Sequence, residues 1–226
     1  MTKADIIEML NQITGGLSYT TKMPEASNAI PAKNCKVGTT LRGIKGSVCY
    51  KCYAHDRGNY QWEVVKNAQE RRYKKLYHPL WVTAMTMLLW LKVKSYFRWH
   101  DSGDIDSMKH LCNIIEVCEN TPHIKHWLPT KEKRLVREFL NRGGVIPVNL
   151  VISMSGYFVD GRKVKGFDDQ PQITHHLTYS KRNRDGAVSK GYICPVEDGL
   201  GFKSCDQANC SACWNPSVRV VAGALH

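Results

Sequence analysis

Residues 96–118 read YFRWHDSGDIDSMKHLCNIIEVC. The first five residues have the pattern of a short strand, DSGD is typical of a turn, and apolar side chains then recur every three or four residues. The recurring apolar positions are Ile105, Met108, Leu111, Cys112 and Ile115. This spacing predicts a helix that begins near Ile105 and is capped by Asp104 or Asp106. The stretch is therefore one strand, turn and helix unit.

The same pattern recurs further along the chain. HIKHWL (123–128) is a second strand pattern, followed by Thr130 as the expected cap of a helix that ends at two glycines. VNLVISM (148–154) and ITHHLTYS (173–180) are two more strand patterns. Strands that alternate with helices indicate an α/β fold with a parallel sheet, either a partial βα barrel or an open doubly wound sheet. We predict the partial barrel, as a single domain over residues 1–226.

Composition agrees with a globular chain, since 42% of the residues are hydrophobic and 23% are charged. The apolar run 80–93 is too short to span a bilayer, and the N-terminal sequence has no secretory-signal pattern, so we expect a cytoplasmic protein. The net charge of +12 suggests an anionic partner, such as nucleic acid or a charged metabolite, or else a basic solubilising surface, since the chain has no dense block of lysine and arginine. Residues up to about 60 are expected to be mostly loop, with one short helix near the start.

Nine cysteines are the strongest chemical signal, because a reducing cytosol disfavours disulfides and an odd number cannot all be paired. Seven of them lie in two polar, glycine-containing segments, at about 31–60 and 192–215. The N-terminal group is Cys35, Cys49 and Cys52, and the C-terminal group is Cys194, Cys205, Cys210 and Cys213. Each group contains a CxxC pair, whose two thiolates can face one metal centre. We therefore predict metal ligation by all seven.

The spacing of four and then two residues from Cys205 to Cys213 matches a ferredoxin pattern, so an iron–sulfur cluster, one or two of the 4Fe-4S type, is favoured over zinc. Zinc stays an alternative, because four thiolates also hold a structural zinc ion. Cys112 and Cys118 fall on or near the apolar stripe of a helix, so we expect them to pack in the core and exclude them from the site.

A four-iron cluster held by only three thiolates leaves one iron open. S-adenosylmethionine bound there would make the N-terminal group a radical-generating site. The thirteen residues between Cys35 and Cys49 form a wider gap than radical-SAM enzymes have.

The DSGD turn is the second candidate site, because ligands bind at the carboxyl ends of parallel strands. A carboxylate, a hydroxyl and a glycine can bind an ammonium group or a ribose hydroxyl. We therefore expect Asp101, Ser102, Gly103 and Asp104 to bind a cofactor such as S-adenosylmethionine, with Asp101 the candidate catalytic residue.

The chain resembles the phage gene-product-88-like family. The motifs that carry the resemblance are KMPEASNAIPAKNC (22–35), GSVCYKCYAHDRGNY (46–60), FRWHDSGDI (97–105), TPHIKHWLPTKE (121–132), PVNLVISMS (147–155), and the closing CP and CSACW. The resemblance implies a metal-bearing, radical-SAM-like fold in a phage-type protein of the host cytoplasm. It points to the same seven cysteines and to residues 101–104, and it implies no particular reaction.

Two hypotheses follow. The first is a cluster-bearing, radical-SAM-like enzyme, with a catalytic cluster on the N-terminal cysteines and an auxiliary one on the C-terminal four. The second is a non-enzymatic iron–sulfur protein that carries electrons or binds nucleic acid or a host protein. No general base stands out in the sequence, so enzyme status stays open.

Overall fold

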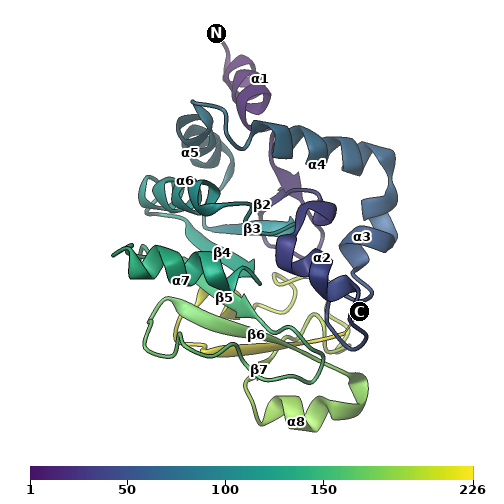
Figure 1. Cartoon of the computed structure of the whole chain (residues 1–226). Helices are drawn as coiled ribbons and strands as arrows, with labels where there is room; N and C mark the ends of the chain where they lie inside the picture. Colours follow the sequence, from purple (N-terminus) through teal and green to yellow (C-terminus); the bar gives the residue numbers. More distant parts are fainter. Residues whose placement is uncertain (226) are drawn as a thin grey trace.

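All strands of the computed structural model, which describes residues 1–225, belong to one eight-stranded sheet (Figure 1). They are β1 (Ser18–Tyr19), β2 (Ala26–Ala29), β3 (Tyr96–Ser102), β4 (Lys125–Thr130), β5 (Leu150–Ser155), β6 (Ile173–Tyr179), β7 (Tyr192–Ile193) and β8 (Val220–Ala224). Their spatial order is β1-β2-β3-β4-β5-β6-β8-β7, and every pairing is parallel except that of β1 with β2. The α/β prediction is confirmed.

The α-helices lie mainly in the connections between these strands. They are α1 (Lys3–Thr14), α2 (Lys36–Arg42), α3 (Tyr53–Asp56), α4 (Glu63–Lys75), α5 (Trp81–Lys92), α6 (Met108–Glu119), α7 (Lys133–Asn141) and α8 (Arg184–Val188). Because β2 to β6 lie side by side in chain order, crossovers of one hand bring the connecting helices to the same face. The strand order is that of a barrel segment, but the sheet is open, with β1 and β7 at its edges.

The face under the helices holds the main core. Phe97 and Trp99 of β3 are fully buried there, with Leu128 of β4 and Ile152 of β5. Helices α5, α6 and α7 supply the opposing side chains, among them Met85, Leu89, Leu111, Ile114 and Val136. In Figure 1 these helices stack along one side of the strands. Alternation along β3 sends Arg98, between Phe97 and Trp99, to the other face.

A C-terminal strap, residues 194–218, covers the second face. Trp214 packs there against Trp127 of β4 and Val151 of β5. The Trp214 indole Nε1 donates a hydrogen bond to the backbone carbonyl of Phe97 at 3.0 Å. The strap therefore crosses from the β7 edge of the sheet as far as β3.

Several local predictions differ from the structure. Helix α6 begins at Met108 and is capped by Ser107, whose hydroxyl accepts the His110 amide at 3.1 Å, so capping by Asp104 or Asp106 was wrong. Thr130 ends β4, and the cap position of α7 is Glu132. The first 60 residues were expected to be mostly loop, yet they contain the buried strand β2.

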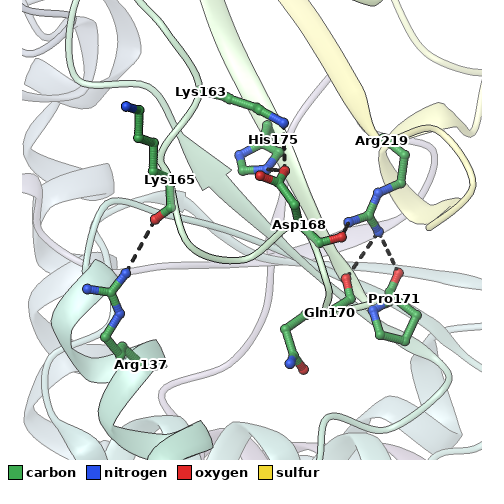
Figure 2. Close-up of polar contacts among 8 residues, drawn as sticks. All are labelled: Arg137, Lys163, Lys165, Asp168, Gln170, Pro171, His175 and Arg219. Carbon is green, nitrogen blue, oxygen red and sulfur yellow. Dashed lines mark hydrogen bonds and ion pairs between the residues drawn. The ribbon is translucent and has the colours of Figure 1, made fainter.

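The connection from β5 to β6 is fastened by polar contacts, drawn in Figure 2. The Asp168 carboxylate lies 2.6 Å from the Lys163 ammonium and 3.6 Å from His175 Nε2. The Arg219 guanidinium donates to the backbone carbonyls of Asp168, Gln170 and Pro171 at 3.0–3.3 Å. Lys163 and Arg219 therefore have their hydrogen-bond and ion-pair partners within the chain.

No helix within residues 1–225 is long and apolar enough to cross a membrane.

Gly103 makes possible the sharp turn after β3, because its φ is +89° and its backbone lies against Ile30. A Cβ at Gly103 would approach the Ile30 carbonyl oxygen to 2.8 Å and overlap the Ile30 side chain. Gly46 has a nearly equal φ of +86°, but open space surrounds the position of its missing Cβ. The two glycines therefore separate the cost of the clash from the cost of the backbone conformation.

We expect Gly103→Ala to lower the free energy of unfolding by about 2–5 kcal/mol, because left-handed strain and a steric clash add. Gly46→Ala should cost about 1–2 kcal/mol from strain alone. Urea denaturation followed by circular dichroism measures both. Equal losses in the two variants would show that the contact with Ile30 does not constrain the turn.

Candidate functional site

The three N-terminal thiols lie beyond the carboxyl ends of β2 and β3. Cys35 and Cys52 precede α2 and α3, and Cys49 lies in the loop between those helices. Gly38 of α2 faces two of the sulfurs: a Cβ there would lie 3.7 Å from Cys35 Sγ and 3.8 Å from Cys49 Sγ. Cys35, Cys49 and Cys52 are all partly buried free thiols.

Burial and nearby charged groups shift the pKa values of Cys35 and Cys49. Burial raises the pKa of Cys35 well above its ordinary value, and Asp104, Cys52 and Cys49 raise it further. Burial also raises the pKa of Cys49, while Lys131 opposes the shift. A bound cation would reverse this balance, because metal ligation needs the thiolate form.

The C-terminal thiols lie on the strap. Cys194 follows β7, Cys205 donates its amide to the Lys22 carbonyl at 3.1 Å, and Cys213 lies next to the buried Trp214. Burial raises the pKa of Cys194 to about 11, with Glu197 and Cys210 adding to the shift. Burial likewise raises the pKa of Cys205 to about 12, with Cys194 and Cys210 adding to it. The Cys210 sulfur lies 3.4 Å from the Tyr192 hydroxyl. All four belong to one local group.

Arg98 interacts with the C-terminal cysteine group and with Tyr53, the residue that follows Cys52. Its guanidinium lies 4.6 Å from the centre of the Trp127 ring and 3.7 Å from the Met23 sulfur, inside the layer between sheet and strap. Burial alone would lower the pKa of Arg98, but Tyr53, Asp101, Tyr60 and Cys213 together raise it. Tyr53 directly follows Cys52, so groups beside both sets of thiols act on this one cation.

Asp101 and Ser102 end β3 with unused polar atoms. Tyr60 donates its hydroxyl to Asp101 Oδ2 at 3.2 Å, and Tyr53 donates to the Asp101 carbonyl at 3.1 Å. The other carboxylate oxygen, Oδ1, and the Ser102 hydroxyl are buried without a hydrogen-bond partner in the described residues. Burial raises the pKa of Asp101, while Arg98 opposes this. Such atoms are available to a ligand.

Asp104, by contrast, is occupied by the chain. Its carboxylate accepts hydrogen bonds from the Thr130 hydroxyl at 2.5 Å, the Lys131 amide at 2.9 Å and its neighbour Ile105 at 2.8 Å. It thereby ties the turn after β3 to the end of β4. Of the four residues predicted to bind a cofactor, Gly103 and Asp104 have evident structural roles, whereas Asp101 and Ser102 offer free polar atoms.

The two excluded cysteines occupy different environments. Cys118 is fully buried in the core, as expected. Cys112 is exposed on α6, so its predicted core position was wrong. Within residues 1–225, no group of three or more Cys, His, Asp or Glu side chains is arranged closely enough to enclose a single metal ion.

Comparison with family models matches the chain to Gene product 88 over residues 8–216. The chain belongs to the Gene product 88 family. The match covers both cysteine groups and the whole turn after β3. No curated protein and no solved structure matches the chain.

Sequence reasoning missed Arg98, Tyr53 and Tyr60. A charged residue between two aromatic residues in YFRWH was the available signal, because a strand that buries both faces rarely carries an arginine. The tyrosines gave no signal, since their contacts with Asp101 bridge more than 40 residues of sequence.

Asp104→Ala should lower the free energy of unfolding by about 2–4 kcal/mol, because buried amide donors lose their acceptor. Asp101→Ala should lower it by less, about 1–2 kcal/mol, since one side-chain hydrogen bond and one negative charge beside Arg98 are lost while the desolvation of a partly unpaired carboxylate is relieved. Urea unfolding at pH 7 tests the pair. The reverse order would mean that Asp101 is the structural carboxylate.

Proposed function

We propose that this Gene product 88 protein is an iron–sulfur protein of the radical-SAM-like type. Cys35, Cys49 and Cys52 would hold a catalytic 4Fe-4S cluster. Cys194, Cys205, Cys210 and Cys213 would hold an auxiliary cluster. The observation that carries the proposal is that two cysteine groups more than 140 residues apart in sequence adjoin residues that act on one partly buried cation. The pKa of Arg98 is raised by Tyr53, which directly follows Cys52 of the N-terminal group, and by Cys213 of the C-terminal group.

The residues present fit such clusters in kind. Thiolates are the ligands that iron–sulfur clusters use in proteins. Gly38 keeps clear the space beside the sulfurs of Cys35 and Cys49, where a larger residue would intrude. Arg98 supplies positive charge beside the C-terminal group, which a polyanionic thiolate centre requires.

The three-cysteine group supports enzymatic chemistry rather than electron transfer alone. A four-iron cluster on three thiolates would leave one iron open to S-adenosylmethionine, and once reduced by an external electron donor it would supply radical chemistry. Asp101 and Ser102 would hold polar groups of that ligand with their unused oxygens. The strand order of a barrel segment, with the site at the carboxyl ends, agrees with a partial barrel of this type.

Metal analysis of anaerobically purified protein tests the proposal. We expect about eight irons per chain and an equal amount of sulfide if both groups carry four-iron clusters, and about four irons if one does. Cys210→Ser should remove about half of the iron in the first case. Cys112→Ser is the matched control, because this exposed thiol lies outside both groups, and it should leave the iron content unchanged.

Stoichiometric zinc without sulfide or visible absorption would replace the proposal with a structural zinc protein. Loss of iron in Cys112→Ser but not in Cys210→Ser would overturn the assignment of ligands.

Asp101 gives the test that separates an enzyme from an electron carrier. Reduced protein should bind S-adenosylmethionine and cleave it slowly, and Asp101→Ala should weaken binding about tenfold or more, because a charge-assisted hydrogen bond is lost. Isothermal titration measures binding, and chromatography of the cleaved nucleoside measures turnover. Iron content should stay at the wild-type value. An iron-loaded protein that does not bind S-adenosylmethionine would be an electron carrier or a binding protein.

A further inference from the structure

The loops around the N-terminal thiols carry an excess of positive charge. Residues 33–57 contain six lysines and arginines, at 33, 36, 42, 45, 51 and 57, and one acidic residue, Asp56. Lys45, Lys51 and Arg57 are exposed, and no ion pair of the described residues includes them. The cations of Figure 2 differ, since Lys163 and Arg219 bind groups of the chain itself.

Exposed aromatic rings lie among these cations. Tyr50, between Cys49 and Cys52, is 42% exposed, and Phe158 is 46% exposed. Phe158 is brought to the same place by backbone bonds, because the Val48 amide donates to the Tyr157 carbonyl and the Val159 amide to the Gly46 carbonyl, both at 3.0 Å. We call Lys45, Tyr50, Lys51, Arg57 and Phe158 the rim.

Unpaired cations interleaved with exposed rings match one ligand chemistry. Lysine and arginine bind phosphates, and aromatic side chains stack on unpaired bases, which is how proteins hold single-stranded nucleic acid. A base-paired duplex hides the faces of its bases, so it would use only the cations. The chain's net charge of +12 attracts either form.

We propose that the rim binds single-stranded nucleic acid and presents it to the N-terminal cysteine group. That the strand is a substrate of this group rests on the function proposed above, whereas the binding itself does not. Because α2 and α3 lie beyond the carboxyl ends of β2 and β3 (Figure 1), a strand on the rim would pass beside Cys49 and Cys52.

Fluorescence anisotropy with a fluorescein-labelled 20-nucleotide oligo-dT tests this on anaerobically purified protein. Lys45→Gln/Lys51→Gln/Arg57→Gln should weaken binding about tenfold or more, and it should reduce the slope of log K against log salt by about 2. Lys92→Gln/Lys94→Gln/Lys125→Gln removes the same charge at the amino ends of β3 and β4 and should change the affinity by less than about threefold.

A second pair of variants tests stacking. Phe158→Ala should weaken oligo-dT binding about fivefold or more. Tyr19→Ala removes a ring that is 63% exposed on β1, at one edge of the sheet, and should have no effect. Circular dichroism and metal content of each variant confirm that the fold is kept.

Equal losses in the two charge variants, or a duplex of the same length bound as tightly as oligo-dT, would overturn the inference. Metal analysis of the same samples separates the two proposals. If the protein contains no metal but still binds oligo-dT through the rim, the nucleic-acid site is supported and the cluster is refuted. If the protein carries iron but the rim variant binds oligo-dT normally, the cluster is supported and the nucleic-acid site is refuted.

Discussion

A guanidinium that packs, only partly exposed, against the face of a β-sheet needs negative charge and a polarisable surface around it, and Arg98 has both. The Trp127 ring lies beneath its cation, and Asp101, Tyr53, Tyr60 and Cys213 raise its pKa from different segments of the chain. Burying an unpaired charge is costly, so these groups are held together by the requirement to compensate it. The DSGD turn, the loop after Cys52 and the strap are therefore all positioned in relation to one side chain.

Much of the fold followed from local pattern. The predictions for β3, β4, β5 and β6 place these strands within a few residues of their observed bounds, because aromatic and β-branched residues leave a strong strand pattern. Strand β2 has no such pattern in its sequence. Its sequence ASNA contains no strand-favouring residue, yet all four side chains are buried, because pairing with β3 overrides local preference. The core position predicted for Cys112 was wrong for a related reason, since an apolar residue at the margin of a helical stripe can face solvent.

In the candidate site, too, local features could be predicted from the sequence and long-range contacts could not. Spacing alone predicted the two cysteine groups, because a CxxC turn is a local feature. Spacing could not separate Asp101 from Asp104, which lie three residues apart. Asp104 is satisfied by Thr130 and Lys131 of a neighbouring strand and its loop, whereas Asp101 keeps an unused oxygen. Only long-range contacts decide which carboxylate is structural and which is free for a ligand.

The open sheet and the strap are two parts of one solution. A barrel buries its inner face by closing the sheet, and here β1 and β7 remain edges. The inner face is buried instead by residues 194–218, with Trp214 against Trp127 and Val151 and a hydrogen bond from Trp214 to β3. Apart from the short 3-10 helix Ala212–Trp214, this strap has no regular secondary structure, and its own backbone hydrogen bonds are local turns, such as that from the Cys210 amide to the Cys205 carbonyl. Its four cysteines are spaced along its length, and metal ligation by them would fix the segment that covers Arg98. Under the proposed function, the auxiliary centre would therefore complete the fold over the site that the N-terminal thiols adjoin.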